Sequence, residues 1–273
     1  MILVTGGNGQ LGTELSKLLP DAIFTDANEL DITDENAVME FVKSHNVDTI
    51  VNCAAYTAVD NAEDNIELAT KVNVDGPKNL AKTGAKLIHI STDYVFDGMG
   101  CKPYTPEDKT NPISVYGKTK LAGEKAVIEN ANIYVIIRTA WLYSPYGKNF
   151  VKTMRMLGET KESINVVCDQ IGTPTYAGDL AEVIKQIIPQ LKKENSGIYH
   201  FTNEGVCSWY DFSTEIMEQS KLKCRVNPVP SSAYPTKATR PFYSVLDKSK
   251  IKKVFGIEIS HWKKGLEKCL KQF

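Results

Sequence analysis

Short apolar runs rich in β-branched residues alternate along this chain with longer segments of helical periodicity. The runs stand at residues 1–5, 22–25, 48–53, 86–91, 133–138 and 197–202. Short strands that are apolar on both faces are typical of a parallel sheet covered by helices on each side. The pattern therefore predicts an α/β fold with a doubly wound parallel sheet, and ligands of such a sheet bind at the carboxyl ends of its strands.

The segments between the strands predict helices, and the regularity loosens after residue 140. We expect helices over residues 13–19, 33–44, 60–83, 116–130, 176–191 and 209–220, a strand at 163–168, and short helices near 247–255 and 261–270. A proline-rich loop holds Pro228, Pro230 and Pro235. We interpret residues 1–145 with 176–204 as the sheet domain, and residues 146–175 with 205–273 as a smaller substrate-binding lobe.

Three glycines follow the first strand at a spacing that indicates dinucleotide binding. Gly6, Gly9 and Gly12 lie between that strand and the next helix. Such a turn leaves backbone N–H groups and the positive end of the helix dipole free for a pyrophosphate, as in a Rossmann-type domain. Asp26 ends the second strand, where an acidic side chain binds the adenosine ribose. Its carboxylate and the non-basic Gly7 favour NADH over NADPH, although Asp26 also suits a turn.

Two further segments lie where this cofactor is expected. Asp31 and Ile32 precede a helix and are placed to line the adenine. Ala54 and Ala55 follow the third strand, and their small side chains let a cofactor approach the backbone.

Tyr116 and Lys120 start a predicted helix and share one of its faces, because they stand four residues apart. A free tyrosine titrates near pH ~10, and a neighbouring cation lowers its pKa. The pair therefore suits proton exchange with an alcohol or carbonyl oxygen. Taken alone, the same spacing also fits an ordinary solvated helix face.

Composition excludes several other classes of function. The chain has 273 residues and a formal net charge of −1, so no basic field indicates nucleic acid or an acidic membrane surface. No apolar run approaches the ~20 residues that span a bilayer, and no signal peptide is evident. The six cysteines form no C-x-x-C pair, which favours reduced thiols in a cytoplasmic protein and no zinc site.

With these motifs in order, the chain resembles the extended short-chain dehydrogenase/reductases. The resemblance rests on the glycine pattern, Asn73-Val74-Asp75-Gly76, Ser91-Thr92 and Tyr116-x-x-x-Lys120. Within that superfamily it resembles the dTDP-4-dehydrorhamnose reductase family. The segments that carry this resemblance are residues 54–60, 91–98, 138–143, Gly147-x-Asn149-Phe150, 169–175 and Arg240-Pro241.

The resemblance implies reduction of dTDP-4-dehydro-β-L-rhamnose to dTDP-β-L-rhamnose with NADH or NADPH. It implies that Thr92 holds the C4 carbonyl, Tyr116 protonates its oxygen, and Lys120 lowers the pKa of Tyr116 and binds the nicotinamide ribose. It also places a further set of residues at the cofactor: Asn8, Gln10, Leu11, Tyr56 and Asn73, besides Gly6, Gly9, Gly12, Asp26, Asp31, Ile32, Ala54 and Ala55.

For the dTDP-sugar, the resemblance implies contacts from Thr92, Asp93, Tyr94 and Trp141, with Asn149 and Arg240 at the diphosphate. Tyr94 and Trp141 also fit as core aromatics, and Arg240 as a surface charge. Two other functions stay open: reduction of another 4-keto-6-deoxy sugar nucleotide, and a non-catalytic cofactor-binding regulatory subunit.

Some members of the family hold a divalent cation between carboxylates at a dimer interface. Glu14 matches one such position, but Lys271 stands near the place of the expected C-terminal acid. We therefore expect no metal, and a homodimer only if another interface forms it.

Overall fold

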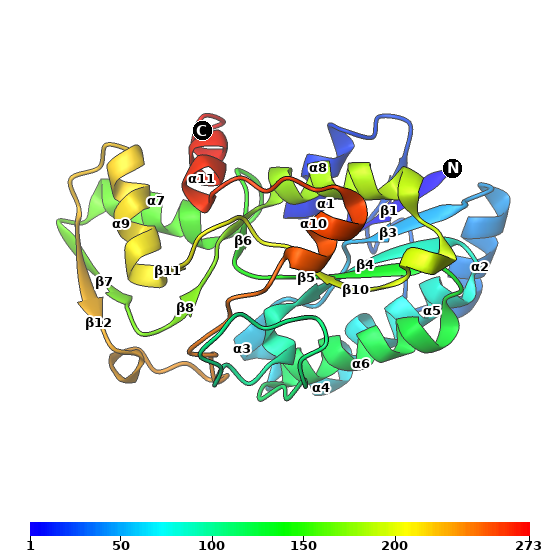
Figure 1. Cartoon of the computed structure of the whole chain (residues 1–273), viewed down its shortest axis with the longest axis horizontal. Coiled ribbons are helices and arrows are strands. Elements are labelled where there is room, and N and C mark those ends of the chain that lie inside the picture. Colours follow the sequence, from blue (N-terminus) through cyan, green and yellow to red (C-terminus); the bar gives the residue numbers. More distant parts are fainter.

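A six-stranded, entirely parallel sheet forms the centre of the chain in a computed structural model that describes residues 1–273 (Figure 1). Its strands run in the order β10-β5-β4-β3-β1-β2. They are β1 (Ile2–Thr5), β2 (Ile23–Thr25), β3 (Thr49–Asn52), β4 (Lys86–Thr92), β5 (Tyr134–Thr139) and β10 (Gly197–His200). The order reverses at β1, so the loop after β1 opens at a switch point, where sheets of this kind bind ligands.

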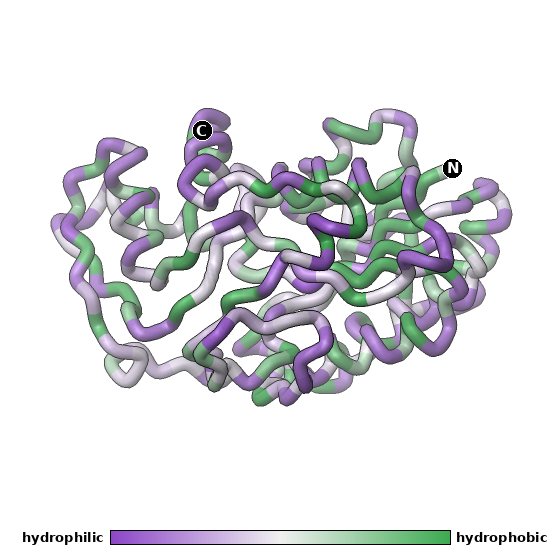
Figure 2. Tube along the Cα trace, in the orientation of Figure 1, coloured by the Kyte–Doolittle hydropathy of each residue, from purple (hydrophilic) through white to green (hydrophobic).

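The two faces of the sheet are covered by different helices, which confirms the predicted Rossmann-type fold. Helices α1 (Gln10–Ser16), α8 (Ala177–Ile187) and α10 (Ser249–Phe255) pack on one face. Helices α2 (Glu35–Ser44), α5 (Gly76–Lys82) and α6 (Val115–Asn130) pack on the other. Figure 2 shows the hydrophobic stretches concentrated in the strands between these layers.

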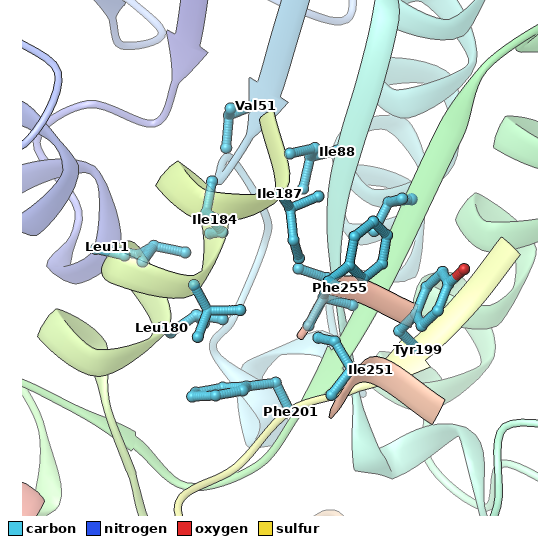
Figure 3. Close-up of a cluster of buried hydrophobic side chains, with 14 of the residues drawn as sticks. Leu11, Val51, Ile88, Leu180, Ile184, Ile187, Tyr199, Phe201, Ile251 and Phe255 are labelled. Carbon is cyan, nitrogen blue, oxygen red and sulfur yellow. The ribbon is translucent and has the colours of Figure 1, made fainter. Parts of the chain in front are cut away.

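The larger core cluster joins segments that are far apart in the chain. In Figure 3, Leu180, Ile184 and Ile187 of α8 and Ile251 and Phe255 of α10 surround the side chains of the sheet. Helix α10 falls within the expected lobe, residues 205–273, but its apolar side chains belong to the core of the sheet. The domain boundary drawn from sequence therefore differs from the packing at this helix, because short amphipathic helices carry no local signal of the surface they cover.

The smaller lobe lies at one end of the molecule (Figure 1). It contains α7 (Phe150–Thr160), α9 (Trp209–Gln219) and α11 (Trp262–Leu270), together with three strand pairs. The pairs are β7 (Ser163–Val167) with β12 (Arg225–Val229), β8 (Ile171–Gly172) with β11 (Cys207–Ser208), and β6 (Leu142–Tyr143) with β9 (Thr175–Tyr176). An aromatic and aliphatic cluster around Phe212, Ile216 and Leu266 forms its core.

Two local predictions were wrong. The segment around Pro228 was expected to be a loop, but it forms β12, which pairs with β7 in a sheet of two strands. Proline is tolerated there because an edge strand can leave its N–H side unpaired. The helix expected over 60–83 is divided into α3 (Val59–Ala62), α4 (Ile66–Thr70), a π-helical turn at Lys71–Asp75 and α5.

Every cysteine of the chain is free. None of the helices combines the length and the apolar character that crossing a bilayer requires.

Candidate active site

A cavity of about 820 Å³ lies along the carboxyl edge of the sheet. Its wall includes most of the residues singled out from sequence. For the cofactor these are Gly6, Asn8, Gly9, Gln10, Leu11, Gly12, Asp26, Asp31, Ile32, Ala54 and Ala55. Thr92, Asp93, Tyr94, Tyr116, Lys120, Trp141 and Asn149 line the same cavity, whereas Tyr56, Asn73 and Arg240 do not.

The glycine loop is packed too closely for side chains at its key positions. A Cβ at Gly12 would lie 2.4 Å from the carbonyl oxygen of Gly6, so the loop and α1 meet backbone to backbone. Gly6 has φ +71°, a left-handed conformation that favours glycine, and a Cβ there would lie 2.7 Å from the amide nitrogen of Ala54. No side chain caps the first turn of α1, so its N–H groups face the cavity free of an internal acceptor. This cradle fits a dinucleotide pyrophosphate.

The far end of the cavity is acidic. Asp26 and Asp31 line it, and the Glu29 carboxylate accepts a hydrogen bond from the backbone nitrogen of Asp26 at 2.9 Å. Hydrogen bonds from the hydroxyl and backbone nitrogen of Thr33 lower the pKa of Asp31. The basic residues in the wall are Lys120 and Lys148, and both lie on segments that follow β4 in the chain. No basic side chain of the wall comes from the segments around Asp26 and Asp31.

Tyr116 and Lys120 lie on the first turns of α6, which begins at Val115 after the N-cap Ser114. The Ser114 hydroxyl accepts a hydrogen bond from the backbone nitrogen of Gly117 at 3.1 Å, which caps the helix. Tyr94 meets the Tyr116 ring edge to face, with ring centroids 5.4 Å apart. Lys120 is buried, and its ammonium donates to the carbonyl oxygen of Ile90 at 2.7 Å. Helix α6 is thereby tied to β4 just before Thr92.

Burial governs the protonation of Tyr116 and Lys120. Burial raises the pKa of Tyr116 well above its ordinary value, opposed by a hydrogen bond with Thr92. Burial also lowers the pKa of Lys120 to about 8. The side chains that act on the pKa of Tyr116 are Thr92, Asp93 and Tyr94, and Lys120 is not among them, so the lowering ascribed to Lys120 stays a prediction. Tyr116 keeps its proton at neutral pH, which is the state required of a proton donor.

Thr92 ends β4, Asp93 follows it, and the two side chains turn toward each other. The Thr92 hydroxyl donates to an Asp93 carboxylate oxygen at 3.0 Å and accepts from the backbone nitrogen of Tyr94 at 3.2 Å. The second carboxylate oxygen of Asp93 is buried without a partner. Burial raises the pKa of Asp93 to about 7, so this carboxyl titrates in the physiological range. The single hydroxyl proton of Thr92 is thus bonded to Asp93.

Trp141 forms the opposite wall in a strained conformation. Its φ is +49°, which is rare for a large side chain. Its indole stacks on that of Trp209 with centroids 3.6 Å apart and an interplanar angle of 11°. The lobe therefore holds an aromatic face against the cavity.

Three residues that were expected to contact the cofactor or the substrate form hydrogen bonds within the protein. The Asn73 side chain binds the backbone of Tyr56, at 2.8 Å to its nitrogen and 3.1 Å to its oxygen, and so shapes the segment after β3. The Asn149 amide donates to Gln10 at 2.9 Å and also to two backbone carbonyls, and its oxygen caps α7.

Arg240 is the third. Its guanidinium donates to Asp60 at 2.5 Å and to the Tyr94 hydroxyl at 3.2 Å. It therefore lies next to the cavity through Tyr94 but outside its wall, with one side occupied by a carboxylate.

Sequence reasoning missed several wall residues, including Cys53, Thr57 and Lys148. Lys148 stands between Gly147 and the helix cap Asn149, and is exposed at the cavity beside the glycine loop. The only sign of Lys148 in the sequence was its position between Gly147 and the helix-capping Asn149. Glu14, the expected match to a family metal ligand, accepts instead from Lys17 at 2.8 Å and from Tyr176 at 3.1 Å. Lys271 bonds to Glu267.

Comparisons with known proteins identify the family of the chain. The family described as RmlD substrate binding domain matches residues 1–273. A dTDP-4-dehydrorhamnose reductase of Aggregatibacter actinomycetemcomitans is 41% identical, over 97% of this chain and 97% of the relative.

Two solved structures are also similar over nearly the whole length. A dTDP-4-dehydrorhamnose reductase of Clostridium acetobutylicum has 45% identity and a TM-score of 0.95, over 99% of this chain and 98% of that one. The enzyme of the same name from Bacillus anthracis, in complex with NADP, has 40% identity and a TM-score of 0.95, over 100% of this chain and 99% of that one.

Proposed function

The chain belongs to the dTDP-4-dehydrorhamnose reductase family, and from this premise we propose that it reduces the C4 keto group of dTDP-4-dehydro-β-L-rhamnose to give dTDP-β-L-rhamnose. The observation that carries the proposal is the meeting of Thr92, Tyr116 and Lys120 in one cavity with the glycine loop. A regulatory subunit would not need these three groups together.

The proposed chemistry divides the work among residues of the wall. A reduced nicotinamide, when bound along the glycine cradle, supplies the hydride. Thr92 turns its hydroxyl from Asp93 to the substrate carbonyl and orients it. Tyr116, which burial keeps protonated, donates its phenolic proton to the oxygen that gains negative charge. Lys120 holds a positive charge near this oxygen while its pKa of about 8 keeps it largely protonated at neutral pH.

Contacts to the sugar nucleotide come from both sides of the cavity. Trp141 and Tyr94 offer aromatic faces to the sugar, and the unpartnered oxygen of Asp93 can accept a hydrogen bond from a sugar hydroxyl. Arg240 would reach the diphosphate from the rim by turning partly from Asp60. Asn149 acts in this proposal through Gln10, because its own amide is fully bonded.

We propose further that NADH serves at least as well as NADPH. The wall near the adenosine end carries Asp26 and Asp31, with Glu29 bonded to the backbone of Asp26, and none of the wall residues in these segments is basic. Lys71, outside the wall, is a cation that acts on Asp31. A carboxylate at this place repels that phosphate, whereas it accepts hydrogen bonds from the ribose hydroxyls of NADH.

One assay tests both proposals. The keto-sugar nucleotide is supplied with NADH or NADPH, and the loss of reduced-nicotinamide absorbance is followed. We expect turnover with both cofactors and kcat/KM for NADH no lower than for NADPH.

The Tyr116→Phe variant tests the proton donor and should lose at least 100-fold in kcat and keep its affinity for cofactor. No turnover with either cofactor would refute the reductase proposal, and a strong preference for NADPH would refute the second. A panel of other 4-keto-6-deoxy sugar nucleotides compares substrates by kcat/KM.

A further inference from the structure

A fully buried ion pair lies behind the proposed catalytic residues. Glu124 is 1% exposed and Arg138 is 2% exposed. The guanidinium donates from Nε to Glu124 Oε1 at 2.9 Å and from its terminal nitrogen to Oε2 at 2.7 Å. Two buried charges are retained only with close geometry and further hydrogen bonds, because each loses its hydration.

Other hydrogen bonds connect this ion pair to the end of β4, where Thr92 lies. The Ser91 hydroxyl donates to Glu124 Oε1 at 2.5 Å, and Ser91 immediately precedes Thr92. Arg138 lies opposite Ser91 in the pairing of β4 with β5, and also donates to the carbonyl oxygen of Pro106 at 3.4 Å. Glu124 therefore links three segments: α6, the end of β4 and the neighbouring end of β5.

Glu124 also belongs to the face of α6 that carries the chemistry. Tyr116, Lys120 and Glu124 follow one another at four-residue spacing, so they lie on one side of the helix. The negative charge of Glu124 acts on Lys120 and opposes the effect of its burial. The other titratable groups that interact with Lys120 are Cys53, after β3, and His89, on β4. Burial raises the pKa of Cys53 to about 12 and lowers that of His89, so both are neutral at pH 7.

We infer that Glu124 is a positioning residue of the proposed reductase site: through Arg138 and Ser91 it sets α6 against the end of β4, and it supplies the negative charge that faces the buried Lys120 ammonium. This inference rests on the proposed function for its effect on turnover. Its geometric and electrostatic parts concern the protein alone.

Variants of the two partners test the inference. If the pair were purely structural, both variants would affect the Lys120 pKa alike, whereas a Glu124 that supplies negative charge to Lys120 makes them differ. Glu124→Gln and Arg138→Gln both break the ion pair between these two residues and should both lower thermal stability. Only Glu124→Gln removes a negative charge from Lys120. We therefore expect the pKa of Lys120 to fall by about one unit in Glu124→Gln and not to fall in Arg138→Gln.

The first measurement needs no turnover. Protein labelled with ¹³C at the lysine ε-carbons is titrated by NMR, and the Lys120 signal is assigned by its loss in Lys120→Arg. In the second measurement, on the enzyme with cofactor and keto-sugar, the alkaline limb of the kcat profile should move about one pH unit lower in Glu124→Gln. The KM for the sugar should change less than threefold. Glu35→Gln, which breaks an exposed pair with Lys82, is the matched control and should leave both profiles unchanged.

The inference fails if Glu124→Gln and Arg138→Gln leave the same Lys120 titration as the native chain. If Glu124→Gln does not fold, the double variant Glu124→Gln/Arg138→Gln, which leaves no lone buried charge, replaces it. A lowered Lys120 pKa in the double variant supports the inference, and an unchanged one overturns it. Absence of turnover in the native protein would refute the proposed function, while the NMR titration would still decide the role of Glu124.

Discussion

Burial decides the chemistry of single residues in this cavity. Asp93 is 3% exposed, and burial raises its pKa to about 7 despite the hydrogen bond from Thr92. The folded chain therefore binds a proton at Asp93 more tightly than the unfolded chain, in which an aspartate titrates near pH ~3.9. Above pH 7 the folded protein carries an uncompensated buried charge at Asp93, which lowers the free energy of unfolding.

Asp93→Asn should show this cost directly. Because the folded-state pKa is raised, the native protein loses stability as pH rises from about 4 to about 7, by on the order of 4 kcal/mol for a shift of three units. The variant lacks this loss, so its melting temperature should equal the native value near pH 4 and exceed it at pH 8. Its turnover should fall at least tenfold, since an amide is a weaker acceptor for a sugar hydroxyl.

The control for this prediction is Asp97→Asn. Hydrogen bonds from the backbone nitrogen of Met99 and from Asn111 lower the pKa of Asp97, so this group stabilises the fold at neutral pH. Its amide variant should melt lower than the native protein at pH 8. Thermal unfolding at pH 4 and pH 8 checks both signs, and a lower melting temperature of Asp93→Asn at pH 8 would contradict the argument.

At the scale of elements, helix α6 reaches its place because glycines let it touch neighbouring backbone. A Cβ at Gly123 would lie 2.1 Å from the carbonyl oxygen of Asn73, in the π-helical turn. A Cβ at Gly117 would lie 2.2 Å from the carbonyl oxygen of Tyr94. Backbone atoms cannot rotate away as a flexible side chain can, so α6 is held at a fixed distance from both segments. That distance positions Tyr116 and Lys120.

Gly123→Ala should therefore displace α6. We expect a loss of roughly 1–3 kcal/mol in the free energy of unfolding, and a lower kcat with the Kd for cofactor less affected. Lys125→Ala, an exposed position on the same helix, is the control and should change stability by no more than about 0.5 kcal/mol. Urea denaturation and steady-state kinetics measure the two effects. Equal stability of the Gly123→Ala and native proteins would show that the helix can shift freely.

At the scale of the whole molecule, the lobe and the sheet domain meet at the cavity. Trp141 belongs to the segment after β5, whereas Trp209 starts α9 in the lobe, and their rings stack at 3.6 Å. Phe150 and Phe212 extend this aromatic contact into the core of the lobe. Asn149 makes a second connection, from the cap of α7 to Gln10 beside the glycine loop. The lobe thus supports Trp141 in the cavity wall while it contacts the glycine-loop end through Asn149.

Trp209→Leu should disturb the sugar end alone. Without its stacking partner, the strained Trp141 can leave the cavity wall, so KM for the sugar nucleotide should rise about tenfold, equivalent to ~1.4 kcal/mol, with an unchanged Kd for NADH. The near-UV circular dichroism of the coupled indoles should weaken. Trp262→Phe, in the core of the lobe, is the control: it should lower stability and leave KM near the native value. If the KM of Trp209→Leu equals the native value, the Trp141–Trp209 stack does not contribute to substrate binding.

Much of the architecture follows from patterns that are local in the chain. Alternation of apolar strands with amphipathic segments predicted the strands and helices in their succession along the chain, because each strand or helix depends on residues within one or two turns. The glycine spacing and the Tyr116/Lys120 spacing predicted the cavity wall for the same reason. Strand ends shifted by one or two residues, and Pro228 was misjudged because edge pairing depends on a distant strand.

Tertiary structure alone decided how the side chains at the site are used. Arg240 meets Asp60 across 180 residues, Asn73 binds the backbone of Tyr56, and Asn149 is bonded to Gln10 across 139. No periodicity carries such pairings. The raised pKa of Tyr116 and the Glu124–Arg138 pair arise from burial by several elements at once. The sequence by itself determined which chemical groups reach this edge of the sheet, because local folding carries them there, and long-range packing determined their partners and their charge.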